Sequence, residues 1–228
     1  MVALVFVGPF AGAALSDRLQ PPMGMLRVDC CVMVTRLGRL GVWPILLLTV
    51  LLIGCTTTVI PPPSPAEAVK VYLLDHGRHP SLVMPTPEGH LVRYAYGDWS
   101  WYALARTGNL DAVRAVLWCN PAALGRREYG SSDLNAVLGQ APAVHVYQIT
   151  VSGADVEQLR GELNAVFERN ISTLHANEEY HLDFVRDPRP YSGIHNCNHV
   201  MSSWLRQLNC EVNGLSFLCK WRVVGAAD

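Results

Sequence analysis

The stretch Tyr191-Ser-Gly-Ile-His-Asn-Cys-Asn-His-Val-Met-Ser-Ser-Trp-Leu-Arg-Gln-Leu208 decides the fold, because it sets one cysteine directly before a segment of helical periodicity. Its apolar residues recur at spacings of one, three and four: Val200, Met201, Trp204, Leu205 and Leu208. This spacing predicts a helix of about three turns with one buried face. Cys197 then lies at the helix start, where unpaired N–H groups and the helix dipole favour an anion.

A thiolate at Cys197 would be a nucleophile. A helix N-terminus can lower the pKa of a thiol well below its ordinary value of roughly 8.5. The same N–H groups could hold the oxyanion of an acyl-transfer intermediate. Such a nucleophile also needs a base, and His76 and His79 stand in the turn Asp75-His-Gly-Arg-His-Pro80 at the entry to a strand. Each of these histidines alone equally fits a solvated turn.

The composition is that of a globular protein. Half of the residues are apolar, 16% are charged and the net charge is −1. A chain with this balance has no basic excess to neutralise a phosphate backbone, and its arginines are scattered. We therefore expect no nucleic-acid partner.

The N-terminal part indicates export. Residues 1–32 fit an upstream extension or a start assigned too early, because Met33-Val-Thr-Arg-Leu-Gly-Arg39 opens a better signal peptide over residues 33–54. The apolar run Val42–Ile53 follows, and Leu52-Ile-Gly-Cys55 matches the bacterial lipobox. Lipidation at Cys55 is the prediction. The alternative is an uncleaved anchor, for which the run is short, since a span needs about 20 apolar residues.

A proline- and threonine-rich segment follows the lipobox. Residues 55–68 hold four prolines and few apolar residues, so they predict a tether to the membrane. Thr56, in place of aspartate, indicates sorting to the outer membrane, at its periplasmic face. Residues 69–228 are enough for one domain.

The domain reads as α+β. Alternation and turn residues predict strands within residues 69–74, 81–84, 90–96, 143–151 and 182–185. Helices are expected over residues 111–119, after a cap at Asn109, and over residues 152–169, after a cap at Ser152. Neighbouring strands joined by short turns indicate an antiparallel sheet, with helices packed against it.

Three motifs carry a family resemblance. Asn196-Cys-Asn-His-Val200 resembles the Asn-Cys-Glu-His-Phe motif of lecithin–retinol acyltransferase-like proteins, and His79-Pro-Ser-Leu-Val83 resembles their His-x-x-aliphatic-aliphatic strand. Over residues 72–208 the chain is similar to an uncharacterised bacterial family labelled urease-associated, with His-Gly-Trp-His, Gly-Trp-Gly-Asp and Thr-Cys-Asn. Here these motifs stand as His76-Gly-Arg-His79, Ala95-Tyr-Gly-Asp98 and Asn196-Cys-Asn198.

The resemblance implies a circularly permuted, NlpC-type papain-like fold, in which an antiparallel sheet packs on the nucleophile helix. It implies Cys197 as nucleophile and His79 as general base, with His90 or Asp98 orienting the imidazole. We take Asp98 as the third catalytic residue, and Asn196, Asn198 and His76 as substrate-binding or oxyanion residues. The implied substrate is a cell-wall peptide amide or an acyl lipid, and no cofactor or metal is expected.

Two alternatives use the same residues differently. His76, His79, His195, Cys197 and His199 could be metal ligands, because His195, Cys197 and His199 alternate along the chain. Cys197 could instead form a disulfide with Cys119, Cys210 or Cys219 in an oxidising periplasm. A third possibility is an envelope scaffold that keeps the fold without activity.

Overall fold

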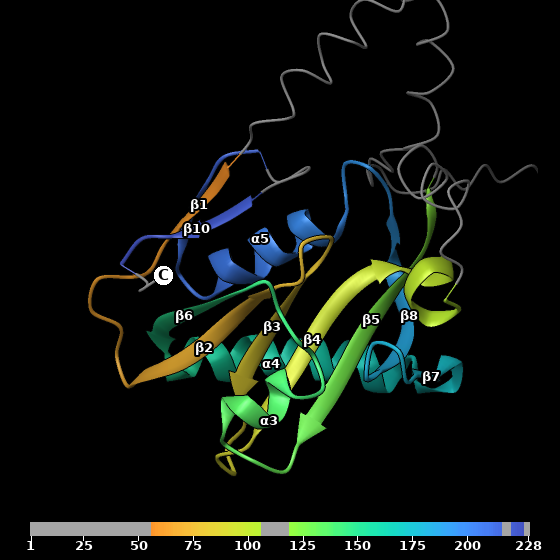
Figure 1. Ribbon diagram of the computed structural model, residues 1–228, viewed down its shortest axis with the longest axis horizontal. Helices are drawn as coiled ribbons and strands as arrows, with labels where there is room; N and C mark the ends of the chain where they lie inside the picture. The colour runs from red at the N-terminus through yellow and green to blue at the C-terminus, as the bar shows by residue number, and fades with distance from the viewer. Residues whose placement is uncertain (1–55, 106–118, 216–219, 226–228) are drawn as a thin grey trace, which may run out of the picture.

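The main element of the protein is a seven-stranded sheet. The structure, a computed structural model, describes residues 56–105, 119–215 and 220–225 (Figure 1). The strand order is β6-β2-β3-β4-β5-β8-β7, and every pairing in this sheet is antiparallel. The strands are β2 (Ala68–Asp75), β3 (Pro80–Pro85), β4 (Leu91–Asp98), β5 (Asn120–Tyr129), β6 (His145–Ser152), β7 (His175–Asn177) and β8 (Leu182–Tyr191). The α+β class with an antiparallel sheet is confirmed.

The two longest helices pack on one face of this sheet. They are α4 (Gly153–Arg169) and α5 (Cys197–Gln207). One apolar cluster joins α5 through Met201, Trp204 and Leu205 to sheet residues such as Leu73 and Tyr94. The buried positions of α4 in the same cluster are Val156, Leu159, Leu163 and Phe167. The apolar residues that recur with helical periodicity in both helices therefore form their buried faces.

The opposite face of the sheet carries shorter elements. These are α3 (Leu134–Leu138) and the π-helical turn η3 (Trp99–Ala103). Trp99 and Ala103 pack there against Ala95 and Phe184. The adjacent strand residues Tyr94 and Val185 belong to the cluster on the α5 side. The 3-10 turn η4 (Ile171–Thr173) connects α4 to β7. The sheet is thus covered on both faces along much of its length.

A second, three-stranded sheet corrects the predicted tether. Residues 55–68 were expected to be a flexible linker, yet β1 (Thr56–Ile60) is the middle strand of a sheet with β9 (Glu211–Asn213) and β10 (Lys220–Val223). Thr57 and Val59 are fully buried. Threonine, valine and isoleucine favour strands, and the partner strands come from the other end of the chain. Figure 1 shows α5 between this small sheet and the large one.

Several other elements differ from expectation. β5 was not predicted, because its sequence contains Pro121, Gly125 and two alanines, which are poor strand formers. β8 continues to Tyr191, well beyond the predicted Val185. Ser152 is the N-cap residue of α4, but its side chain makes no capping hydrogen bond. The predicted helix over residues 111–119 and its cap at Asn109 lie outside the described residues, apart from Cys119.

Candidate functional site

Four predicted or newly found polar groups meet at one end of the large sheet. β3 begins directly after His79, β4 ends at Asp98 and β8 ends at Tyr191. The strand registers pair Ser81 with Ala95, Asp98 with Ala122 and Asn120 with Tyr191, so these ends lie at the same edge. α5 begins at this edge with Cys197.

Cys197 is the first residue of α5, as predicted. It is 5% exposed. The hydroxyl of Tyr191 forms hydrogen bonds with both the side chain and the backbone N–H of Cys197. Burial, followed by the charge of Cys197, raises the pKa of Tyr191, so this phenol stays protonated. Tyr191 is therefore a direct hydrogen-bond partner of the candidate nucleophile, a role that was not predicted from the sequence.

Asn196 is the N-cap of α5. Its Oδ1 accepts hydrogen bonds from the backbone N–H groups of Asn198 and His199, at 3.0 and 3.1 Å. The Asn196 side chain thus already binds two of the first-turn N–H groups that were expected to hold an oxyanion. His199 Nδ1 donates to the same oxygen at 3.0 Å. The backbone N–H of Cys197, the third first-turn donor, pairs instead with the Tyr191 hydroxyl.

Two further tyrosines lie near Cys197. The pKa of Tyr102 and that of Tyr96 are both raised, mainly by burial and in part by the charge of Cys197. The ring of Tyr96 stacks on that of Tyr191 with centroids 6.1 Å apart. Phenols therefore form much of the described surroundings of the sulfur.

His79 contacts the same tyrosine cluster. Its ring lies 5.2 Å from the ring of Tyr102 and 5.8 Å from that of Tyr180, both edge-on, and stacks on His76 at 4.7 Å. Burial, then the charges of His76 and Arg93, lowers the pKa of His79 to about 3. Tyr102 thus touches His79 and lies within electrostatic range of Cys197, which brings the predicted pair to one site.

Asp98, the expected third catalytic residue, is the last residue of β4 at this edge of the sheet. It is 4% exposed, and its Oδ1 accepts a hydrogen bond from the backbone N–H of Trp101 at 2.9 Å, which caps η3. Its charge contributes to the raised pKa of Tyr102 and of Tyr191. The carboxylate therefore acts on the tyrosines around Cys197. His90, the other candidate for orienting His79, is exposed and precedes β4. It lies at the end of that strand opposite to Asp98, and a rise of about 3.3 Å per residue separates the two residues by about 25 Å.

A substitution at Gly97 tests where the Tyr102 ring lies. A Cβ at Gly97 would overlap the Tyr102 ring, so Gly97→Ala must displace that ring. We expect the free energy of unfolding to fall by about 1–3 kcal/mol, as for other overpacked sites. Urea unfolding measures this. Gly130→Ala is the matched control, since nothing lies within 4 Å of its Cβ. Equal stability of the two variants would contradict the described packing of Tyr102.

The lowered pKa of His79 predicts a pH-dependent stability. Below the ordinary pKa of 6.5 the unfolded chain binds a proton at His79, whereas the folded protein does so only near pH 3. Stability therefore falls as the pH drops through this window. From about pH 7.5 to about pH 5, the wild type should lose about 1–2 kcal/mol more than His79→Gln. Urea unfolding at both pH values measures the difference.

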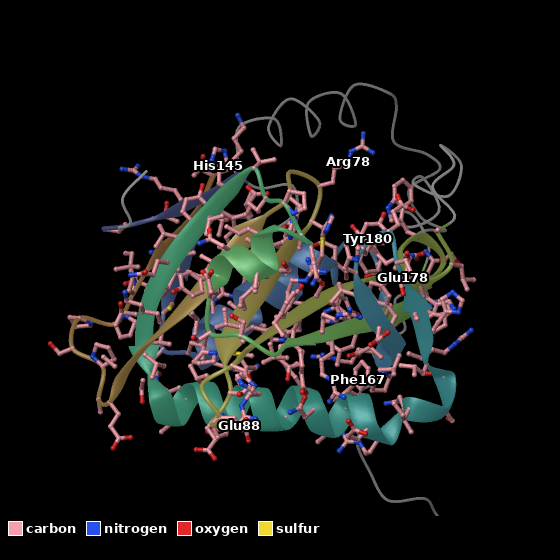
Figure 2. All side chains as sticks on the ribbon, turned by 60° about the horizontal axis from the view of Figure 1, so that its bottom comes forward. Arg78, Glu88, His145, Phe167, Glu178 and Tyr180 are labelled. Atoms are coloured by element: carbon pink, nitrogen blue, oxygen red, sulfur yellow. The ribbon has the colours of Figure 1, made fainter. Side chains whose placement is uncertain are left out.

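His145 supplies the control for that experiment. It is exposed on β6, where Figure 2 labels it, so His145→Gln should leave the pH dependence as in the wild type. If His79→Gln shows the wild-type dependence as well, His79 is not the buried neutral imidazole described.

The five predicted metal ligands fall into separate groups. His76 Nδ1 donates to the carbonyl of Pro142 and Nε2 accepts from the hydroxyl of Ser81, both at 2.9 Å, when the ring is neutral. His195 lies instead against Tyr96, with ring centroids 5.5 Å apart, and its Nε2 is buried without a hydrogen-bond partner. Over the described ranges, which include all five residues, no three His, Cys, Asp or Glu side chains are arranged to hold a metal. The structure therefore does not assemble the metal alternative.

The described cysteines do not form a disulfide. Cys119, Cys197 and Cys210 are thiols in the structure. Burial raises the pKa of Cys210 to about 12, so that thiol is unreactive at neutral pH. Cys219, the other candidate partner, lies outside the described residues, as do Cys55 and the predicted signal segment.

Comparison with known proteins adds no identification. No helix in the described part of the chain is long and apolar enough to cross a membrane. A scan against models of protein families finds no match, and searches of curated proteins and of solved structures find no similar one.

Proposed function

We propose that the protein is a cysteine hydrolase or acyltransferase of the permuted NlpC-type papain-like kind, acting on an amide or an ester. The mixed α+β fold supports this reading. An antiparallel sheet packs on a helix that starts with Cys197, and the histidine precedes a central strand of that sheet.

The observation that carries the proposal is the tyrosine cluster between the two catalytic candidates. Tyr191 hydrogen-bonds Cys197, and Tyr102 contacts His79 while lying in electrostatic range of Cys197. A thiol and an imidazole at one sheet edge, enclosed by protonated phenols, form a site suited to acyl transfer.

Each residue has a role in the proposed reaction. Cys197 attacks the acyl carbon, and neutral His79 accepts the thiol proton and returns it to the leaving group. The substrate oxygen displaces the Tyr191 hydroxyl from the Cys197 N–H, so that this N–H and the Tyr191 O–H both donate to the oxyanion. Water then releases the acyl group in a hydrolase, and a second acceptor takes it in a transferase.

An envelope location fits the proposed substrates. Lipidation at Cys55 would hold the domain at the periplasmic face of the outer membrane, where both cell-wall peptides and acyl lipids are present. β1 begins directly after this cysteine, so the domain would lie close to the membrane.

The reaction class can be tested directly. Purified protein is incubated with cell-wall peptide fragments and, separately, with an acyl-labelled phospholipid. We expect release of peptide in the first case or label on Cys197 in the second, by mass spectrometry. His79→Gln should slow the active reaction by about 100-fold or more, and exposed His90→Gln should not.

Two outcomes would overturn parts of the proposal. Full activity of His79→Gln together with loss in His195→Gln would make His195 the base, since its ring also lies in this cluster. A folded wild type that is inactive on both substrates is the result expected of a scaffold.

A further inference from the structure

A small cavity lies beside His79, on the face of the large sheet away from α5. Its volume is about 190 Å³, and its lining residues include His76, His79, Ser81, Arg93, Ala95 and Tyr180. Ala95 and Leu182 belong to the apolar cluster of that face, which α5 does not enter. Figure 2 shows Tyr180 and Arg78, the neighbour of His79, toward the same end of the sheet, away from Glu88.

Arg93 is the unusual member of this lining. It stands in the middle of β4 and is only 3% exposed. Its Nη2 donates to the carbonyls of Tyr180 and His181, and its Nε N–H has no hydrogen-bond partner. Within the described ranges the ion pairs are Arg126 with Glu168 and Arg189 with Asp187, so neither provides Arg93 with a counter-ion.

A buried guanidinium without a carboxylate partner is costly in a folded protein. Burial lowers the pKa of Arg93, although arginine stays protonated at all physiological pH values. The other basic lining groups are His76 and His79, whose pKa values are both lowered mainly by burial, so Arg93 is the main positive charge of the cavity. Glu179 also lines the cavity, but its side chain is exposed and not ion-paired with Arg93.

These observations point to a small anion as the occupant. Guanidinium groups bind carboxylates through parallel N–H donors, and the unpartnered Nε supplies one such donor. The cavity is smaller than the roughly 300–1,000 Å³ of sites for drug-sized ligands, so only a short anionic group fits. The hydroxyl of Ser81, fixed on His76, gives the wall a polar group beside this donor.

We propose that this cavity binds a small carboxylate, which is the anionic end of the substrate attacked by Cys197. The assignment rests on the proposed function, because His79 both lines the cavity and contacts Tyr102 at the nucleophile. A bound carboxylate would offset the charge of Arg93 beside His79. It would therefore favour protonation of the imidazole, as the transfer from Cys197 requires.

Isothermal titration calorimetry of the full chain with propionate, and with its neutral isostere propionamide, tests the carboxylate site. We expect propionate to bind at least about tenfold more tightly than propionamide. Inorganic phosphate in a parallel titration distinguishes a carboxylate site from a general oxoanion site: binding as tight as that of propionate would overturn the assignment to a carboxylate.

Variants separate this proposal from the enzymatic one. Arg93→Met should weaken propionate binding at least about tenfold. Arg126→Met, which removes an ion-paired arginine on the α4 side, should not. Ala95→Leu, which fills the cavity without removing charge, should also prevent binding and covers the case in which Arg93→Met does not fold. Cys197→Ala should bind propionate as the wild type does.

Equal binding of propionate and propionamide would overturn the carboxylate site, as would wild-type affinity in folded Ala95→Leu. Neither result depends on catalysis. Conversely, if Cys197→Ala keeps full activity while propionate still binds through Arg93, the proposed function fails and the anion site stands.

Discussion

Cys197→Ala is expected to abolish acyl transfer, with the rate falling by at least about a thousandfold, because it removes the proposed nucleophile. Tyr191 and Tyr102 lie around this position, Tyr102 contacts His79, and the raised pKa of Cys210 keeps that thiol protonated. The fold should survive, since the substitution removes one sulfur atom, and the midpoint of thermal unfolding checks this. The measurement is turnover of whichever substrate the wild type accepts.

Cys210→Ala is the matched control for this loss. It removes an equally buried thiol at the far end of α5, directly before β9. Its activity should equal that of the wild type. Residual activity of Cys197→Ala above about one per cent would mean that another group is the nucleophile.

Trp204→Ala should produce the largest loss of stability. Trp204 is 2% exposed and belongs to the main apolar cluster, which joins α5 to the large sheet and the small one. Truncation of a buried tryptophan leaves a cavity and typically costs about 3–5 kcal/mol. Because a small domain is stable by only about 5–15 kcal/mol, this variant should be close to unfolding at moderate temperature. Urea unfolding followed by circular dichroism measures the change.

Ser203→Ala provides the comparison on the same helix. Ser203 is exposed on α5, so its loss should change the free energy of unfolding by no more than about 0.5 kcal/mol. A small effect in both variants would show that α5 is not held by the face that the apolar spacing predicted.

Much of the fold could be predicted from local pattern. The helix at residues 197–207 has its apolar face at the predicted positions, and the helix expected over residues 152–169 is present over residues 153–169. Strand alternation also identified β2, β3, β4 and β6. These elements could be read from sequence because their periodicity reflects burial on one side of a regular backbone.

The elements that escaped prediction depend on partners far away in the chain. Thr56–Ile60 becomes a strand only because β9 and β10, more than 150 residues later, flank it. β5 contains residues with low strand propensity and is held by β4 and β8 on its two sides. Neither arrangement leaves a local signal, since tertiary pairing overrides propensity.

The site shows the same division. The motifs singled out Cys197 and His79, and the structure brings both to the tyrosine cluster. Tyr191 and Tyr102 were missed because their roles follow from where β8 and β4 end. A glycine inside a strand can mark a close approach of another group, and Gly97 is such a glycine, because the Tyr102 ring packs against it. Arg93 was missed because one arginine in an alternating strand gives no sign of being buried.

Alkylation of the full chain by iodoacetamide, followed by mass spectrometry across a range of pH, tests most directly whether the α5 N-terminus activates Cys197. We expect a modification at Cys197 whose rate reaches half its maximum below about pH 8.5, the ordinary value for a thiol, and which Cys197→Ala abolishes. If the folded protein is not modified at Cys197, or only at a pH above that value, the nucleophile assignment is contradicted.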